Sequence, residues 1–451
     1  MNKTLSFLYK LLIAAAILSV SSAAIFLCLD YFKTKEAFPP KTFIGKVEVS
    51  HLNKEEAIEK IKASPIEDAY SPTITFLNPQ NTSEAFVYSV HDLGAIILPE
   101  DTISRAFDFT HSSSYFKDLG TRFSHKNMVL PASVAFNEPM ATAIVMDIES
   151  SIDSPVKEAS IDLNEQTGGY HILGGLPARR LKVVETLNAA KKSIYEGYKT
   201  INLNIDYYEQ PKISEKDLRA APPVHRISIY TTYYGSHDSP NRIHNIKLIA
   251  SWLNNNILMP NEVMSLTSKI GAFTPERGFK EAYVIMQGAL VPQLGGGTCQ
   301  IGTTLYNAAG LADLDILSRR NHSFYFNIYP LGRDATVYPG QADLKIKNNT
   351  GHPILIKTVA NDKKLSFRIY GTTSSKEVEY SNPAVYILDP SGKFRPSSVR
   401  EVLNTDRPFR TVVIRTVKDS SGKKIKEETI RSFYKLYGER TNVPIIRRES
   451  R

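Results

Sequence analysis

The sequence predicts an α+β protein with an apolar membrane-spanning helix at the N-terminus, a mixed α/β module, and a β-rich domain that carries a cysteine at the N-terminus of a helix. Residues 11–29 are uncharged over a length that crosses a hydrocarbon core of about 30 Å. Short strand-like and helix-like runs alternate over residues 42–210, and strand-like runs dominate after residue 225. A chain of 451 residues is long enough for two to three domains.

The N-terminal apolar run predicts the membrane topology. Its sequence, LLIAAAILSVSSAAIFLCL, occupies residues 11–29 and follows Lys3 and Lys10. By the positive-inside rule, residues 1–10 stay in the cytoplasm and the body lies outside the cell. A cleaved signal peptide, with Ser-Ala-Ala at 22–24 as the cleavage region, is the alternative. In both cases we expect an exported body, and in the first a single-pass protein of the cell membrane.

Composition limits the class of partner and the chemistry. The formal charge of +9 suits an anionic envelope surface, and no interleaving of aromatic and basic residues indicates nucleic-acid binding. The two cysteines are Cys28, at the end of the apolar run, and Cys299, so an exported body has no internal disulfide and one free thiol. Ligand spacing for zinc and the frame of a phosphate loop are both missing from the sequence. We therefore expect no metal, no cofactor and no nucleic acid; the sequence does not indicate an oligomeric state.

The segment after the apolar run begins with a stalk and a capped helix. Residues 30–41 are polar and end in two prolines, which predicts a stiff stalk. Residues 43–49 alternate as a strand, and Asn53 with Glu56 has the spacing of a capping box that opens a helix.

A second amphipathic helix and a linker follow. Residues 178–197 predict a helix whose inward-facing apolar residues are Leu181, Val184, Leu187, Ala190 and Ile194. The proline-rich and charged segment 211–224 predicts a linker between domains.

The C-terminal half begins with a capped helix and continues mainly as strands. Ser239 and Pro240 predict the N-terminus of a helix that ends near Asn255. Strand-like runs include 323–330 and 335–339, and a hairpin is expected with its turn at 419–422. Residues 441–451 are expected to form a tail.

The stretch LGGGTCQIGTTLYNAAGL, residues 294–311, points to a reactive thiol. Gly295, Gly296 and Gly297 leave a bare loop before Cys299, and apolar residues recur at helical spacing from Ile301 onward. A helix N-terminus carries unpaired N–H groups and partial positive charge, which favour a thiolate. The N–H groups of residues 297–300, including that of Gln300, are candidates to bind a developing oxyanion.

A nucleophilic cysteine also needs a base and a group that binds the substrate. His322, expected at the start of a strand, is the candidate base, because histidine titrates near neutral pH. Asp334 could orient His322 or cap a turn. Arg242, Arg319 and Arg320 could bind a substrate carboxylate bidentately. The alternative is an inert buried thiol with a structural histidine.

Residues 226–437 resemble the VanW domain of Gram-positive envelope proteins. The resemblance is carried by GGGTCQIG, RRNHS, GRDATV and DLKIKN in that order, preceded by the run from Asn241 to Gly288. Residues 42–210, with their strand and capped helix, resemble the peptidoglycan-binding module of the same proteins. The resemblance implies domains at 42–210 and 225–440, joined by a linker at 211–224.

The VanW resemblance implies a peptidoglycan L,D-transpeptidase, which would cross-link stem peptides between third-position residues through a cysteine nucleophile. Cys299 then matches the catalytic thiol, His322 the motif histidine, Gly295–Gly297 the glycine triplet, and Asp334 the aspartate of the motif DAT. The alternatives are an L,D-carboxypeptidase or peptidoglycan peptidase, and a non-catalytic wall-binding accessory protein of glycopeptide (vancomycin) resistance.

The chain departs from the family pattern at four positions. Gly302 stands where the family usually has serine, and Asn261 replaces the glycine of its PGE motif. Met264 and Leu266 replace aromatic residues.

Overall fold

The computed structural model describes residues 2–111, 114–122, 126–235, 238–286, 289–372, 376–404 and 407–435. The chain divides into two compact units, of which unit 1 comprises residues 1–156 and 177–210, and unit 2 comprises 157–176 and 211–451. The expected tail at 441–451, and residues 436–440 of the expected domain, lie outside the described residues. Helices and strands are mixed in both units, so the α+β class is confirmed.

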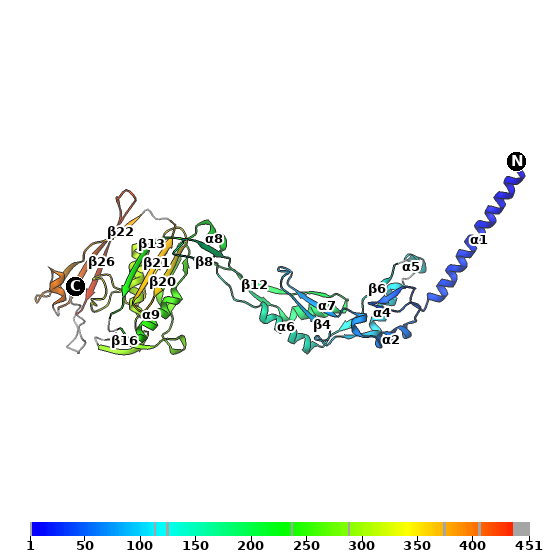
Figure 1. Ribbon diagram of the computed structural model, residues 1–451, viewed down its shortest axis with the longest axis horizontal. Helices are drawn as coiled ribbons and strands as arrows, with labels where there is room; N and C mark the ends of the chain where they lie inside the picture. Colours follow the sequence, from blue (N-terminus) through cyan, green and yellow to red (C-terminus); the bar gives the residue numbers. More distant parts are fainter. Residues whose placement is uncertain are drawn as a thin grey trace. The chain divides into compact units, whose positions relative to one another are not determined.

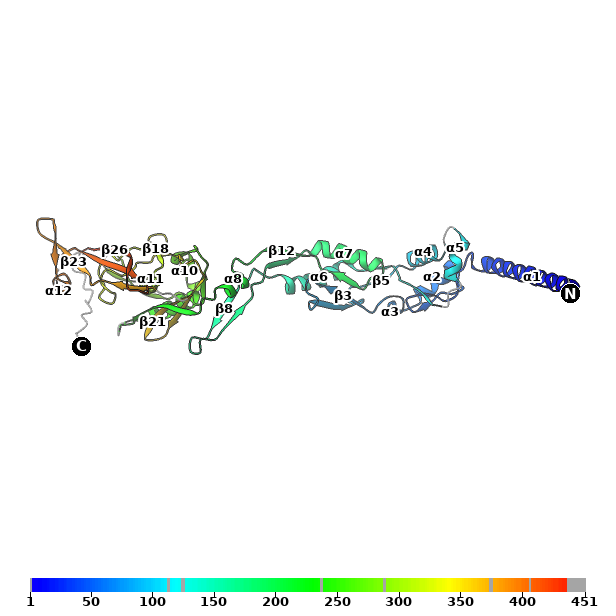
Figure 2. The ribbon, with the colours of Figure 1, turned by 90° about the horizontal axis from the view of Figure 1, so that it is seen from above.

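The N-terminal helix α1 (Asn2–Thr34) is drawn as one continuous helix in Figures 1 and 2. Its segment Phe7–Lys33 is long and apolar enough to cross a membrane. A signal sequence has the same properties, so length and composition are consistent with either form.

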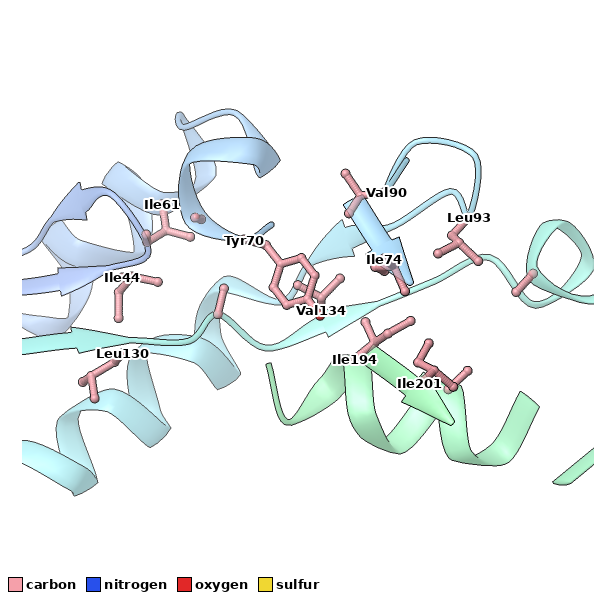
Figure 3. Packing of buried hydrophobic residues seen from close by; sticks show 14 of the residues in the cluster. Ile44, Ile61, Tyr70, Ile74, Val90, Leu93, Leu130, Val134, Ile194 and Ile201 are labelled. Atoms are coloured by element: carbon pink, nitrogen blue, oxygen red, sulfur yellow. The ribbon is translucent and has the colours of Figure 1, made fainter. Parts of the chain in front are cut away.

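Unit 1 is built from short strands and helices around one core. Its elements after α1 are β1 (Thr42–Ile44), β2 (Val47–Glu48), α2 (Lys54–Lys62), α3 (Ile66–Ala69), β3 (Thr73–Leu77), β4 (Ala85–Ser89), β5 (Ile96–Ile97), α4 (Pro99–Thr110), α5 (Tyr115–Arg122), β6 (Met128–Leu130), β7 (Val134–Ala135), α6 (Glu138–Ile152), β10 (Ala178–Leu181), α7 (Val183–Tyr195), β11 (Thr200–Asn202) and β12 (Ile205–Glu209). They form the small sheets β2–β1–β6, β11–β3–β4, β10–β12 and β5–β7. Figure 3 shows the buried apolar side chains that join these sheets to the helices, among them Ile44, Ile74, Val134 and Ile194.

The predicted capping box of unit 1 is confirmed. The side-chain oxygen Oδ1 of Asn53 accepts from the Glu56 N–H at 2.9 Å, and Oε2 of Glu56 accepts from the Asn53 N–H at 3.0 Å. Two N–H groups that the first turn of α2 leaves without helical partners are thereby satisfied.

The helix predicted over residues 178–197 is wrong at its start. Residues 178–181 form strand β10, because they pair with β12 in register Leu181↔Ile205. Helix α7 begins at Val183, and this shift leaves Val184 66% exposed instead of inward-facing. Strand pairing with a distant segment thus overrides the local helical periodicity.

Unit 2 is larger and contains two main sheets. Its elements are β8 (Ser160–Leu163), β9 (Tyr170–Leu173), α8 (Glu215–Ala220), β13 (His225–Tyr233), α9 (Pro240–Leu253), β14 (Asn256–Leu258), β15 (Val263–Ser265), α10 (Leu266–Ile270), η1 (Pro275–Arg277), β16 (Glu281–Met286), β17 (Ala289–Leu294), α11 (Thr298–Leu311), β18 (Asp315–Ser318), β19 (Lys345–Lys347), β20 (Ile354–Ala360), β21 (Lys364–Gly371), β22 (Glu377–Tyr380), β23 (Ala384–Leu388), β24 (Phe394–Ser397), α12 (Val399–Leu403), β25 (Phe409–Lys418) and β26 (Lys424–Tyr434).

The first main sheet is antiparallel, in the order β13–β21–β20–β14, and both its faces are covered. Helices α9 and α11 pack on one face, in a cluster that includes Ile246, Ile301 and Phe367. The hairpin β8–β9 and helix α8 pack on the other face, where Leu355 and Leu218 are buried together. The segment 211–224, which we predict as a linker, therefore contains a helix that contributes to the core of unit 2.

The second main sheet is organised around β25. Strand β26 pairs along one edge of β25, β22 and β23 pair along the other edge, and β24 pairs with β23. The hairpin β25–β26 turns at 419–422 as predicted, with the Gly422 N–H donating to the Asp419 carbonyl at 2.9 Å.

The strands predicted at 323–330 and 335–339 are wrong, because the described residues between β18 and β19 form a loop that contains no strand. Its backbone groups bind partners outside a ladder: the Lys435 N–H donates to the Ser323 carbonyl at 2.7 Å, and the Thr336 N–H donates to the Arg320 carbonyl at 2.7 Å. His322 consequently lies within this loop, which we call the 319–344 loop, and does not begin a strand.

Candidate active site

Helix α11 positions Cys299. The helix begins at Thr298, so Cys299 is its second residue, and its side chain is partly exposed while residues 300–310 are buried. The helix is fixed to the main sheet by polar bonds as well as apolar packing: the Ser228 hydroxyl donates to the Ala308 carbonyl at 2.8 Å. The thiol therefore sits at the accessible end of an otherwise buried helix.

The glycine triplet shapes the loop before the thiol. Gly295 has φ +85° and Gly297 has φ +110°, conformations that residues with a Cβ rarely adopt. A Cβ on Gly295 would also lie 2.5 Å from the ring of Phe273. The loop closes on itself, since the Thr298 N–H and hydroxyl both donate to the Gly295 carbonyl, at 3.2 and 2.6 Å.

The N–H groups at the start of α11 are not equally available. The Gln300 N–H donates to the Gly297 carbonyl at 3.0 Å, and its buried side chain donates to the Thr232 hydroxyl at 2.9 Å. In the described part of the chain, the Cys299 N–H has no hydrogen-bond acceptor. Among the N–H groups of residues 297–300, those of Gly297 and Cys299 have no acceptor in the described part of the chain and are the donors that an oxyanion could use; the Gln300 side chain is directed into the core.

The 319–344 loop brings His322 and Asp334 to the thiol. Asp334 Oδ2 accepts both the His322 backbone N–H, at 2.7 Å, and the ring Nδ1–H, at 2.6 Å. The other ring nitrogen makes no bond to Asp334. The charge of His322 acts on the Cys299 thiol, which itself donates to the Val337 carbonyl oxygen at 3.7 Å. Thiol, imidazole and carboxylate thus act on one another at one site, and the carboxylate fixes the ring.

The charges in this chain favour a thiolate–imidazolium pair. Burial raises the pKa of the Cys299 thiol, but the positive charge and hydrogen bond of His322 outweigh it, and the net pKa is lowered. Burial lowers the pKa of His322, whereas the charges and hydrogen bonds of Cys299 and Asp334 raise it, to about 9. Burial raises the pKa of Asp334, yet its bonds from His322 and Tyr434 leave it below the ordinary value. These shifts favour a thiolate on Cys299 and a proton on His322.

Arg319 supports the site from within the protein. Its Nε–H donates to the Asp334 carbonyl at 2.7 Å, and its guanidinium also bonds the Gly332 carbonyl at 3.1 Å and the Ser432 hydroxyl at 3.0 Å. The guanidinium lies 3.3 Å from Asp334 Oδ1 and 5.2 Å from the centre of the Tyr306 ring. These contacts hold the 319–344 loop and occupy the groups that a substrate carboxylate would need.

The other two arginines differ in position. Arg242 is mostly buried, forms an ion pair with Asp238 at 3.0 Å, and contributes to lowering the pKa of Cys299. Arg320 is exposed, and its guanidinium donates to the Gln341 carbonyl at 3.3 Å. Arg242 is thus the arginine of the three whose charge acts on the thiol.

Aromatic residues that the sequence did not indicate surround the imidazole. Tyr329 stacks on the His322 ring at 5.6 Å between centroids and 20° between planes, and Phe326 meets its edge at 5.0 Å and 84°. Tyr434, at the end of β26, donates to Asp334 Oδ1 at 2.6 Å. Tyr434 is distant from Asp334 in the chain, and no local pattern could have linked the two residues.

The substitution of glycine for serine at 302 has a steric basis. A Cβ on Gly302 would lie 2.4 Å from Cγ2 of Val337, so the valine fills the space of a side chain at this position. The remaining departures lie at Asn261, in the left-handed region with φ +65°, and at the buried residues Met264 and Leu266.

Comparisons with known families identify parts of both units. Residues 241–370 match the family model VanW, described as "VanW like protein", which covers Cys299, His322 and Asp334. This region is a VanW-like domain. Residues 86–202 match a second family, described as "Putative peptidoglycan binding domain". The VanW-like domain and this second match together indicate a cell-wall-associated protein.

Two curated proteins are similar to part of the chain. "Uncharacterized protein YoaR" of Bacillus subtilis is 35% identical over 162 residues, which are 36% of this chain and 53% of that protein. "Vancomycin B-type resistance protein VanW" of Enterococcus faecalis is 25% identical over 158 residues, 34% of this chain and 58% of that protein. The chain spans somewhat more than half the length of these relatives. No solved structure matches the chain.

Proposed function

We propose that the protein is a cysteine-dependent L,D-transpeptidase of peptidoglycan. The observation that carries this proposal is the grouping of Cys299, His322 and Asp334 at the start of α11, where Asp334 binds the ring of His322 and His322 lowers the pKa of the thiol. The match to a peptidoglycan-binding family supports the class of substrate. Thiol chemistry and a cell-wall module together favour acyl transfer on stem peptides.

The first step forms an acyl-enzyme. Cys299 Sγ, as thiolate, attacks the carbonyl carbon of the amide between the third-position residue and the terminal D-alanine. The oxyanion of the tetrahedral intermediate accepts a hydrogen bond from the Cys299 N–H and is favoured by the start of α11. The C–N bond then breaks, D-alanine leaves with a proton from His322, and a thioester remains.

The second step transfers the acyl group. The side-chain amine of a neighbouring third-position residue attacks the thioester carbonyl and gives its proton to His322. The C–S bond breaks, and the products are a new amide cross-link and the regenerated thiolate–imidazolium pair. Attack by water in place of the amine would make the protein an L,D-carboxypeptidase.

Arg242 is the arginine we assign to the carboxylate of the leaving D-alanine. It lies close enough to Cys299 to affect its pKa, and a substrate carboxylate would replace Asp238 as its partner. Arg319 has no such freedom, because it is bonded within the 319–344 loop.

We also propose how the chain is placed relative to the membrane and the cell wall. Helix α1 anchors the protein with residues 1–10 inside, and unit 1 binds peptidoglycan; the stalk expected at 30–41 is not formed, because α1 continues to Thr34 and Phe38 is buried in the core of unit 1. Retention of the enzyme on its polymeric substrate raises the effective concentration of stem peptides near Cys299.

Incubation with a disaccharide tetrapeptide, followed by mass spectrometry, tests the proposal. We expect a cross-linked dimer with loss of D-alanine for the native protein and for Cys28→Ala, which alters the other cysteine, and no product for Cys299→Ala. A shortened monomer would assign the carboxypeptidase reaction. Identical spectra for the native protein and Cys299→Ala would reject catalysis by the thiol.

A further inference from the structure

Tyr434 is the last residue of β26 and is completely buried. Its hydroxyl donates to Asp334 Oδ1 at 2.6 Å and accepts the Gly332 N–H at 3.1 Å. The hydroxyl therefore bridges the carboxylate to the backbone two residues before it. The pKa of Tyr434 is raised, first by burial and then by the charge of Asp334, so the phenol keeps the proton that it donates.

Strand β26 and Lys435, the residue that follows it, also bind the 319–344 loop beside His322. The Asn321 side-chain amide donates to the Phe433 carbonyl at 2.7 Å, and the Lys435 N–H donates to the Ser323 carbonyl at 2.7 Å. These two bonds flank His322 on either side in the sequence. One strand thus binds the backbone around the imidazole and the carboxylate that orients it.

The two carboxylate oxygens of Asp334 have different tasks. Oδ2 accepts both hydrogen bonds from His322, and Oδ1 is held by Tyr434, with Arg319 at the longer distance of 3.3 Å. Rotation of the carboxylate about its Cβ–Cγ bond would break the bond to the ring. A short, charge-assisted bond to Oδ1 resists that rotation.

We propose that Tyr434 is a positioning residue that holds Asp334 in the orientation that fixes His322, so that the catalytic unit extends to β26. The inference rests on the cysteine mechanism proposed above. It goes beyond the family match, which ends at residue 370, whereas the phenol comes from the second sheet. A domain cut at the end of the family match would keep all three reacting groups and lose this support.

The pH dependence of thiol alkylation measures the effect of Tyr434 on the thiol. It separates this effect from effects on folding, and it does not depend on the identity of the substrate. The charged and titratable groups near the site include His322, Asp334, Arg242, Asp238, Arg319, Tyr325 and Tyr329, and Tyr434→Phe leaves all of them in place. Iodoacetamide is the probe, because it reacts with the thiolate and needs no peptidoglycan.

We expect Tyr434→Phe to move the inflection of the alkylation rate to higher pH by about one unit, the equivalent of one lost charge-assisted hydrogen bond. Tyr325→Phe is the matched control: its ring lies 5.7 Å from that of Tyr434, but its hydroxyl donates to the Tyr329 carbonyl, and no comparable shift is expected. In an Asp334→Asn background, Tyr434→Phe should have no further effect, because the two changes act on one bond.

An unchanged inflection in a folded Tyr434→Phe variant would overturn the inference, and so would equal shifts in the native and Asp334→Asn backgrounds. If the alkylation of the native protein shows the pKa of an ordinary thiol, the proposed cysteine mechanism itself fails. This result differs from an unchanged inflection in Tyr434→Phe, so failure of the mechanism and failure of the inference are distinguishable. If Tyr434→Phe does not fold, 3-fluorotyrosine at this position keeps the ring and hydroxyl. Its fluorine resonance should then move on Asp334→Asn, and an unmoved resonance would also reject the role.

Discussion

Replacement of His322 by glutamine is the most direct test of the thiolate–imidazolium pair. The change removes the positive charge and the ring hydrogen bond that lower the pKa of Cys299, and it leaves the burial that raises it. Glutamine is close in length to histidine and stays neutral at all pH values used. The thiol should therefore become an ordinary or weaker acid without losing its place at the start of α11.

The expected magnitude follows from thiolate populations. A thiol with a pKa of about 8.5 is ionised to about 3% at pH 7, and a buried thiol is ionised less. Complete ionisation of Cys299 would make it react with iodoacetamide about 30-fold faster at pH 7 than an ordinary thiol, so about 30-fold is the upper limit for the ratio of native to His322→Gln rates. Because thiolates of low pKa are somewhat weaker nucleophiles, the inflection of the full pH profile is the more reliable quantity.

The assay follows carboxamidomethylation of Cys299 by mass spectrometry between pH 5 and pH 10. His352→Gln is the matched control, since His352 is an exposed histidine in the same unit. The native protein and the control should share an inflection well below that of His322→Gln. Coincident profiles for all three proteins would refute the ion pair and, with it, the activation of the thiol.

Three further predictions follow from single observations. Turnover of a tetrapeptide should fall as pH rises through about 9, because His322 there loses the proton that it gives to D-alanine; activity that persists unchanged well above this pH would exclude His322 as the acid. Gly302→Ala should lower the free energy of unfolding of unit 2 by about 1–3 kcal/mol in urea titrations. Adding Val337→Ala should restore much of this free energy, because it removes the methyl group that lies 2.4 Å from the new Cβ. If the second change gives no rescue, the steric explanation is rejected. Asn53→Ala should destabilise unit 1 by about 1 kcal/mol in thermal melts through loss of the N-cap, and Asn53→Ser should cost less; equal losses would show that the cap is not the cause.

Local sequence patterns were sufficient to predict those features that depend on residues close together in the chain. The capping box of α2 and the hairpin turn at 419–422 each involve residues within a few positions of one another. The same holds for the glycine triplet and Cys299, because backbone freedom and the electrostatics of a helix start act over one turn.

Features that depend on contacts between distant segments of the chain were decided by the tertiary structure. The strand β10 displaced a predicted helix because β12 pairs with it, and the hairpin 157–176 belongs to unit 2 because its apolar side chains pack on the main sheet. Arg319 binds the 319–344 loop from inside and is not free for a substrate.

The sequence by itself pointed to Cys299, His322 and Asp334 as the candidate site, through residue types that acyl transfer requires and through a family resemblance. Only the folded chain revealed the hydroxyl of Tyr434 on Asp334, since 100 residues separate the two. The residue types in a sequence indicate which reactions are possible. The orientation of a carboxylate depends on which distant strand packs against it in the folded chain.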